Sequence, residues 1–333
     1  MRADGRPIAG RDYPRTWQEF EAWFSDEGAC RQYLQRLRWP DGFICPRCAS
    51  RQGWRSKRGL WVCGGCQRQT SVTAGTVFAD THSLLRTWFA TAWYVTGQKQ
   101  GVSALGLQAV LGLGSYETAW SWLHKLRRAM VRPGRDQLFG DVEMDETYVG
   151  GPEPWAFGRR TTSKSIVAIA VERRGRVKLG RVRMARVPNL SIPTMTDFAT
   201  TALERGSTIR ADGLSSYRGL VAAGYRHQVI TLKAVEEPAH VAMPAVHRVA
   251  SLLQRWLLGT HQGAVRVHHL DYYLDEFTFR FNRRGARHRG LLFFRLSPAS
   301  RRHPPGHRRS AHGKASQHVG VTGVKRIGRF VNG

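Results

Sequence analysis

Residues 141–151, DVEMDETYVGG, open the part of the chain that decides the fold. Two more strand-like runs follow, SIVAIAVE at 165–172 and VKLGRVRMARV at 177–187. The first of these two is apolar enough for a buried strand. Beyond them, helical and strand-like patterns alternate. The expected elements are a helix at 191–205, a strand at 207–213, a short helix at 214–223, a strand at 227–232 and a long helix at 242–259.

This order of elements predicts an α/β fold for residues 138–296, with a core of the ribonuclease-H-like type. The amphipathic segment HHLDYYLDEFTFRFNRR at 268–284 is expected to pack on that core. Beyond residue 297 the chain is rich in Gly, Pro, Arg and His and has almost no apolar periodicity. We therefore expect residues 297–333 to form a basic disordered tail.

Two cysteine pairs mark the N-terminal part of the chain. Cys45-Pro-Arg-Cys48 and Cys63-Gly-Gly-Cys66 are separated by fourteen residues, which is close to a common zinc pattern. Four thiolates would close a tetrahedral shell, so the zinc would be structural. Disulfides are the alternative, but a reducing compartment disfavours them. Together with two helices expected before the first pair, residues 14–80 are interpreted as N-terminal helices and a zinc ribbon.

Residues 81–132 return to a helical period, broken by the turn GLGSYET at 112–118. Ser115 is the expected N-cap of the second helix, which ends in a basic cluster. We interpret this segment as helix-turn-helix-like and DNA-binding, although a plain helical linker explains the apolar spacing equally well. The candidate phosphate contacts in it are Lys125, Arg127 and Arg128.

The charge of the chain indicates a polyanionic partner. Lys and Arg total 52 against 24 Asp and Glu, which gives a formal charge of +28. Nucleic acid neutralises such an excess through counterion release. No run approaches the roughly 20 apolar residues that cross a bilayer, and the N-terminus lacks the apolar region of a signal peptide. We expect a cytoplasmic, nucleoid-associated protein with no membrane partner.

Two aspartates follow strand-like runs at positions suited to metal chemistry. Asp145 lies in VEMDETYVGG, and Asp212 ends the strand of STIRADG. Phosphodiester cleavage without a covalent enzyme intermediate uses two divalent ions, commonly held by carboxylates on adjacent strands. Either aspartate alone would more often be a turn or capping residue. Together they predict a two-metal site if their strands are neighbours.

The sequence resembles the transposases of bacterial insertion sequences that combine an N-terminal zinc ribbon with a DDE-type domain, in the ISXO-like branch. The matching text is CPRC…CGGC, QTSVTAGTVF, MDETYVGG, ADGLSSY, HRVASLLQRWLLGTHQGAV and YYLDEFTFRFNRR, within about residues 15–295. The resemblance implies that Asp145 and Asp212 are the first two catalytic acids and that Mg²⁺ or Mn²⁺ is bound. It also implies a third metal-site residue, Glu or Asn elsewhere in the family, on the helix 242–259, and a Lys seven residues further on.

The chain departs from that pattern at both of the last positions. His247 occupies the third metal position and Gln254 the Lys position, and nearly two helical turns place both on one helix face. A neutral imidazole binds Mn²⁺ well but is a poorer ligand than carboxylate for Mg²⁺. Alternatively, His247 merely caps or packs the helix. The fallback third carboxylates are Glu236, Glu237 and Glu276, and Glu143 and Glu146 flank Asp145 and are candidates to assist it.

These features predict a DNA-cutting and DNA-joining enzyme. We expect a homo-oligomer that binds double-stranded DNA, both the terminal inverted repeats of its element and the target, and that catalyses cleavage and strand transfer. Arg255, Arg283 and Arg284 are further candidates for DNA contact. One alternative is a catalytically impaired DNA-binding protein derived from such an enzyme, which His247 and Gln254 favour. A ribonuclease with a zinc module is another.

Overall fold

The computed structural model of the protein describes residues 7–131, 135–151, 164–175, 178–230, 242–261 and 265–296. The tail expected at 297–333 and the fallback ligands Glu236 and Glu237 lie outside these residues. None of the helices in the described ranges has the length and apolar character needed to cross a membrane.

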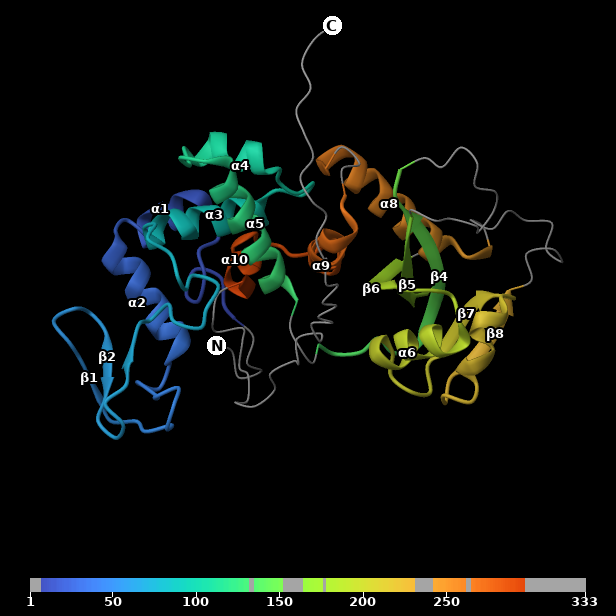
Figure 1. The fold of residues 1–333 in the computed structure, drawn as a ribbon, viewed down its shortest axis with the longest axis horizontal. Helices are drawn as coiled ribbons and strands as arrows, with labels where there is room; N and C mark the ends of the chain where they lie inside the picture. The colour runs from blue at the N-terminus through green and yellow to red at the C-terminus, as the bar shows by residue number, and fades with distance from the viewer. Residues whose placement is uncertain are drawn as a thin grey trace, which may run out of the picture. The chain divides into compact units, whose positions relative to one another are not determined.

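The N-terminal part consists of five helices and a small sheet (Figure 1). Asp26 caps the second helix by accepting from the amide of Ala29, and Ser115 caps the fifth by accepting from Thr118, as its sequence position predicts. Gly112 ends the fourth helix in the left-handed conformation that favours glycine. The elements are α1 (Trp17–Trp23), α2 (Glu27–Arg38), β1 (Gly53–Arg55), β2 (Trp61–Cys63), β3 (Gln69–Thr70), α3 (Leu85–Gly97), α4 (Ala104–Leu111) and α5 (Tyr116–Met130).

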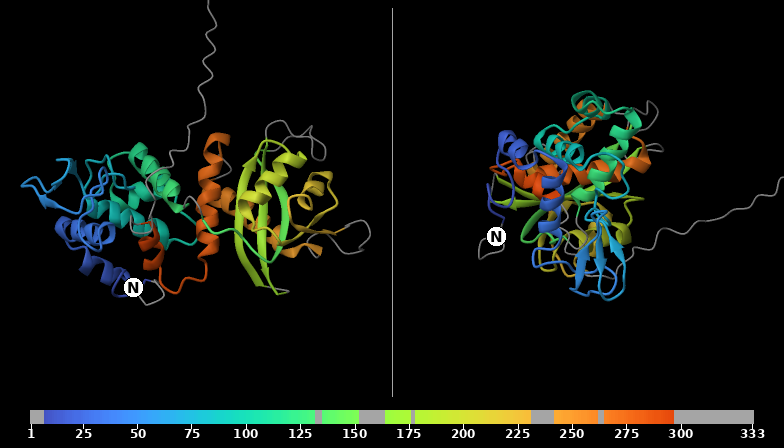
Figure 2. Two further views of the ribbon diagram at one scale, coloured as in Figure 1. Left: turned by 90° about the horizontal axis from the view of Figure 1, so that it is seen from below. Right: turned by 90° about the vertical axis from the view of Figure 1, so that its left-hand side faces the viewer.

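The last helix of the described chain, α10 (Gly290–Leu296), packs in the N-terminal core rather than on the C-terminal sheet (Figures 1 and 2). Phe293 is fully buried there, and its ring centroid lies 5.4 Å from that of Phe89 and 5.7 Å from that of Phe20. Gly290 lies so close to the carbonyl of Pro14 that a Cβ atom would overlap it. The sequence predicted that residues 138–296 form one domain. In the structure the last helix of that range, α10, belongs instead to the N-terminal core, because it is apolar and is buried among aromatic rings of α1 and α3.

The second core is built on a five-stranded sheet with strand order β6-β5-β4-β7-β8. Strands β4 and β5 pair antiparallel, as do β5 and β6, while β7 runs parallel to β4 and β8 runs parallel to β7. This is the mixed α/β architecture that the sequence pattern predicts. The strands are β4 (Asp141–Val149), β5 (Ser165–Arg174), β6 (Lys178–Val187), β7 (Thr208–Asp212) and β8 (Arg226–Ile230).

Helices cover both faces of this sheet, as the alternation of buried residues requires. Met144 of β4 faces the core shared with α6 (Ile192–Ala202) and the 3₁₀ helix η1 (Ser215–Leu220). Ile169 of β5 faces the core shared with α8 (Pro244–His261) and α9 (Val267–Asn282). Because neighbours along a strand point to opposite faces, the residues on either side of Met144 point toward α8.

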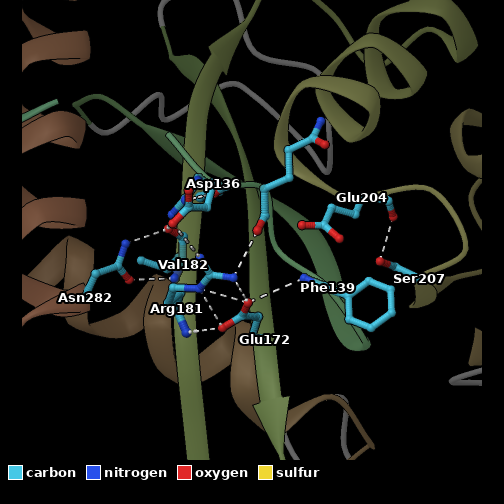
Figure 3. A network of polar contacts seen from close by, with 10 residues as sticks. Asp136, Phe139, Glu172, Arg181, Val182, Glu204, Ser207 and Asn282 are labelled. Atoms are coloured by element: carbon cyan, nitrogen blue, oxygen red, sulfur yellow. Dashed lines mark hydrogen bonds and ion pairs between the residues drawn. The ribbon is translucent and has the colours of Figure 1, made fainter. Parts of the chain in front are cut away.

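A polar network fastens the edge of the sheet to α9 (Figure 3). Asn282 accepts from the amide of Val182 at 2.7 Å and donates to its carbonyl at 3.0 Å, so it satisfies the free edge of β6. Arg181 pairs with Glu172 across the β5–β6 hairpin, with an Nη2 to Oε1 distance of 2.6 Å. Gly180 makes room for that carboxylate, because a Cβ atom there would lie 2.6 Å from the Cβ of Glu172. The edge strand is thereby tied to the C-terminal end of α9.

Candidate functional site

The four cysteines of the N-terminal pairs converge on one point. Their sulfur atoms all lie within 4.8 Å of one another. Cys45 and Cys66 are 3.6 Å apart, and Cys48 and Cys63 are 3.5 Å apart. These distances are far too long for disulfides, and they approach the roughly 3.8 Å between sulfurs that bind one zinc tetrahedrally with bonds of about 2.3 Å. The geometry therefore fits the structural zinc that the spacing predicts.

The backbone prepares these thiols in two matching turns. In the first turn the amide of Ala49 donates to the carbonyl of Cys45, and in the second that of Gln67 donates to the carbonyl of Cys63, both at 3.0 Å. Ala49 and Gln67 have φ of 59° and 55°, the left-handed conformation that closes each turn. Amides of Cys48 and Arg47 donate to the sulfur of Cys45 and lower the pKa of that thiol to about 6. A thiolate ready to bind metal is the result.

The second candidate site lies on the α8 side of β4. Alternation along the strand points Glu143, Asp145 and Thr147 toward the core built with α8, opposite Val171, Ile169 and Val167 of β5. The sequence showed Asp145 as the candidate acid and Glu143 as a candidate to assist it, but gave Thr147 no role. Each of these three side chains lies next to a residue of α8. This face of β4 therefore packs against α8.

Glu143 is fully buried and holds the start of α8. Its Oε2 accepts from the amides of Ala245 at 2.7 Å and Val246 at 3.0 Å, and its Oε1 lies 3.2 Å from Nε of Arg173. Burial raises the pKa of Glu143, while the two amides and the guanidinium favour its charged form. The side chain thus acts as an N-terminal cap supplied from another element. Capping explains this glutamate better than the metal assistance that its position suggests.

Asp212 lies on β7, the strand that runs parallel to β4 and pairs with it. Glu143 of β4 pairs with Arg210 of β7, and the two aspartates each follow two residues later on these parallel strands. Both therefore point to the same face of the sheet. The amide of Leu214 donates to Oδ1 of Asp212 at 3.0 Å, which orients this carboxylate at the end of its strand. The condition that the two strands be neighbours is met.

Tyr217 of η1 contacts one of the acidic side chains of β4. Its hydroxyl donates to Oε2 of Glu146 at 3.1 Å. Burial, and then the carboxylates of Glu146, Asp145 and Asp212, raise the pKa of Tyr217 far above its usual range. The phenol therefore keeps its proton beside Glu146. Tyr217 belongs to the matching motif ADGLSSY, but its sequence position predicted no role for it.

The face of α8 carries His247 and Gln254, as expected from their seven-residue separation. Nε2 of His247 lies 4.0 Å from Oδ2 of Asp145, and both side chains are partly exposed. Nε2 of Gln254 donates to Oγ1 of Thr147 at 3.0 Å. The structure thus brings His247 to the acid that the resemblance pairs it with. It places a neutral amide at the position where the resemblance implies Lys.

The donors suit a divalent cation but are less tightly grouped than the cysteines. Aspartate oxygens and an imidazole nitrogen are ligands that Mn²⁺ accepts readily, and the carboxylates also suit Mg²⁺. Within the described ranges, only the cysteine set brings three or more candidate ligand atoms within 4.8 Å of one another. Asp145, Asp212 and His247 therefore form a more open set.

The predicted DNA contacts are not equally accessible. Arg127 is only 2% exposed, and its Nε lies 2.7 Å from Oε2 of Glu276 in a buried ion pair. The prediction that Arg127 contacts phosphate is therefore wrong for this structure, because no surface is left for DNA. The fallback ligand Glu276 is excluded as well, because its other oxygen lies 2.6 Å from Nη2 of Arg280.

The remaining candidates keep at least part of their surface. Arg128 and Arg255 are exposed, and Lys125 is half-buried with its ammonium near the ring of Trp88. Arg283 and Arg284 stack on Phe279 and Phe281 and donate to backbone carbonyls, so part of their donor capacity is used internally.

Fold and sites define an α/β domain with paired aspartates, preceded by a four-cysteine zinc ribbon. Comparison with protein families agrees with this description. Residues 137–282 match the ISXO2-like transposase domain, and residues 25–69 match the transposase zinc-ribbon domain. The two matches together cover more than half of the chain. The chain therefore belongs to the insertion-sequence transposases that carry this pair of domains, and the resemblance stated from its motifs is confirmed.

A relative from a mobile element supports the same assignment. A protein in transposable element ISH50 of Halobacterium salinarum is 32% identical to the chain over 130 residues. The aligned part makes up 38% of this chain and 43% of that protein. The match thus spans less than half the length of the relative.

Proposed function

We propose that the protein is a transposase that binds the terminal inverted repeats of an insertion sequence and catalyses metal-dependent cleavage and strand transfer of DNA. The observation that carries this proposal is the placement of Asp145 and Asp212 on adjacent parallel strands, with His247 of α8 beside Asp145. A sheet of three antiparallel strands followed by two parallel ones, with helices on both faces, supports a ribonuclease-H-like core. The basic charge supports DNA as the substrate.

In this function each residue near the site has a distinct task. Asp145, Asp212 and His247 would hold Mg²⁺ or Mn²⁺, which when bound activates the attacking oxygen and stabilises the leaving oxygen. Glu143 positions α8 through its two amide contacts, and Gln254 is held by Thr147. Tyr217 orients Glu146 and keeps its proton. The zinc ribbon and the α4–α5 segment would grip the repeat DNA, and assembly as a homo-oligomer would bring two ends together.

The test separates chemistry from binding. Asp145→Ala and Asp212→Ala should each abolish cleavage and strand transfer while leaving the affinity for repeat-ended DNA within about twofold. The matched control is Asp197→Ala, which removes an exposed carboxylate from α6 on the other side of the sheet. Cleavage and joining are measured on labelled repeat-ended duplexes in Mg²⁺ and in Mn²⁺. Retained strand transfer by both site variants would refute the assignment.

A second candidate is a DNA-binding protein that has lost catalysis. The observation that favours it is the neutral Gln254, which donates to Thr147 and brings no positive charge to the site. Under this reading the unchanged chain binds repeat-ended DNA but cuts it in neither metal, and Gln254→Lys with His247→Glu restores cutting. Activity of the unchanged chain in Mn²⁺ alone would instead support His247 as a metal ligand.

A further inference from the structure

A basic groove lies apart from the aspartates, where α8, α9 and the turn between α3 and α4 meet. It encloses about 610 Å³. Its lining contains five Lys or Arg residues and no carboxylate. A cavity of this size suits a ligand of one or two nucleotides better than a flat protein partner. The charge of the lining calls for an anion.

Two hydrogen bonds to one backbone carbonyl hold the apolar part of the groove in place. Nε1 of Trp256 donates to the carbonyl of Gln100 at 2.8 Å, and Oγ1 of Thr260 donates to the same oxygen at 2.6 Å. Gly101 has φ of 83°, and a Cβ atom there would lie 2.9 Å from Nε1 of Trp256. Phe277 and Phe281 also line the groove but are buried, so Trp256, which is half-buried, supplies the accessible aromatic surface. An aromatic surface is therefore present without any ligand having to order it.

The cations of the lining fall into two groups. Arg280 and Arg284 already have partners within the protein. Arg280 forms an ion pair with Glu276, and Arg284 donates to backbone carbonyls. Lys99 and Arg255 are exposed and Arg289 is half-buried, and no ion pair of these three is recorded within the described part of the chain. These three come from three distant stretches of sequence, so only the fold brings them to one groove.

We propose that this groove binds a short unpaired stretch of a DNA strand, with Lys99, Arg255 and Arg289 on its phosphates and its bases against the aromatic surface at Trp256. The proposal rests on the proposed function in that DNA is the substrate. Grooves that combine basic side chains with aromatic surfaces are typical of single-strand binding, because unpaired bases expose their faces. A duplex keeps its bases stacked and would use only the basic rim.

The groove shares α8 with the candidate catalytic site. Arg255 directly follows Gln254, while the groove residues Leu252 and Trp256 lie on a different face of the helix from His247. A strand held in the groove would thus be fixed to the same rigid helix that presents His247 to Asp145. Freed DNA ends could be retained there between cutting and joining.

The experiment measures binding of the full chain without added divalent ions, so it does not depend on catalysis. The probes are a labelled strand of about 12 thymidines, an abasic strand of the same length, and a duplex. We expect Lys99→Ala and Arg255→Ala each to weaken single-strand binding about fivefold at 0.1 M salt and to lower the salt slope by about 0.7. The control Arg205→Ala removes one exposed charge that is not part of the groove lining. It should change neither the single-strand affinity nor the salt slope.

The abasic strand tests the aromatic surface without altering the protein. We expect it to bind at least fivefold more weakly than the thymidine strand, since stacking contributes about 1–3 kcal/mol per base. Equal loss of duplex and single-strand affinity in the variants, with no effect of removing the bases, would mean that the groove takes duplex backbone, and the proposal would fail. Variants that match Arg205→Ala would also overturn it. Either failure would leave the cleavage test of Asp145 and Asp212 unaffected.

Discussion

At the scale of single residues, two carboxylates on one face of β4 have opposite tasks. Asp145 lies beside His247 and keeps part of its surface, whereas Glu143 is fully buried against the first amides of α8. The environment decides the difference, because two amides donate to Oε2 of Glu143 and the guanidinium of Arg173 lies 3.2 Å from its Oε1, which accepts no hydrogen bond from the described residues. A buried carboxylate that caps a helix is a structural anchor, whereas the side chain of Asp145 keeps 16% of its surface at the candidate site.

Glu143→Ala should destabilise the protein because it removes the cap of α8 and leaves Arg173 without its buried partner. We expect a loss of about 3 kcal/mol in the free energy of unfolding, measured by urea titration. Asp141→Ala is the matched control, since Asp141 pairs with the same Arg173 at 2.8 Å but is exposed, and it should cost less than about 1 kcal/mol. Equal losses in the two variants would contradict the anchoring role.

At the scale of elements, three histidines meet where α5, α8 and α9 come together. The ring of His124 lies 4.8 Å from that of His269, and the ring of His261 lies 4.2 Å from that of Tyr273. Among the described residues, Nε2 of His124 and Nε2 of His261 find no hydrogen-bond partner. Burial, reinforced by the nearby charge of Arg127, lowers the pKa of His124 and of His261 to about 4. These side chains are packed as neutral rings.

Acid should therefore loosen this junction. In the unfolded chain these histidines bind protons near pH 6.5, whereas in the folded chain they bind them only near pH 4. The free energy of unfolding therefore falls as the pH is lowered from about 6.5 to about 4. We expect a loss on the order of 1–2 kcal/mol per histidine, discounted because His261 keeps part of its surface. Urea midpoints at several pH values measure it.

His124→Phe should flatten the acid part of that profile, because a phenyl ring packs among the same aromatic neighbours and takes up no proton. His82→Phe, at an exposed position of the N-terminal part, is the control and should leave the profile unchanged. A profile of His124→Phe that still falls as steeply as that of the unchanged chain would rule His124 out as the cause.

At the scale of the whole molecule, α9 joins the two cores. Tyr273 and Phe277 face the sheet, while Phe279 belongs to the N-terminal core. Between these faces Glu276 is buried, and the guanidiniums of Arg280 and Arg127 outweigh the effect of burial and hold its pKa well below its usual range. Arg280 also donates to the carbonyl of Val95 in α3. One helix thus fixes α5 and the sheet relative to each other.

Glu276→Gln should weaken the whole fold, because it leaves two buried guanidiniums without a counter-charge. We expect a cost of about 3–5 kcal/mol in the free energy of unfolding. The control Asp271→Asn breaks the exposed pair of the same helix with Arg186 of β6 and should cost under about 1 kcal/mol. If Glu276→Gln were as mild as this control, the buried pair would not be what holds the two cores together.

Local patterns predicted much of this molecule. The cysteine spacing, the Ser115 cap and the strand runs depend on nearby residues, and the structure has all of them. Arg127 was misjudged as a surface residue because it sits in a basic cluster. A helical signal was nevertheless present, since Arg127 lies four residues after Leu123 and three before Met130, both buried. The burial of Phe293 among residues of α1 and α3 had no local signal, because it joins segments that are more than about two hundred residues apart in the sequence.

The position of α10 also has a consequence for synthesis. The aromatic core that begins with Phe20 stays incomplete until the ribosome has delivered Phe293, after every strand of the sheet has been made. At about 5–20 residues per second the nascent N-terminal helices wait for more than roughly ten seconds with a hydrophobic gap. A polypeptide released early, before residue 290, would keep that gap permanently and would be a substrate for chaperones and proteases.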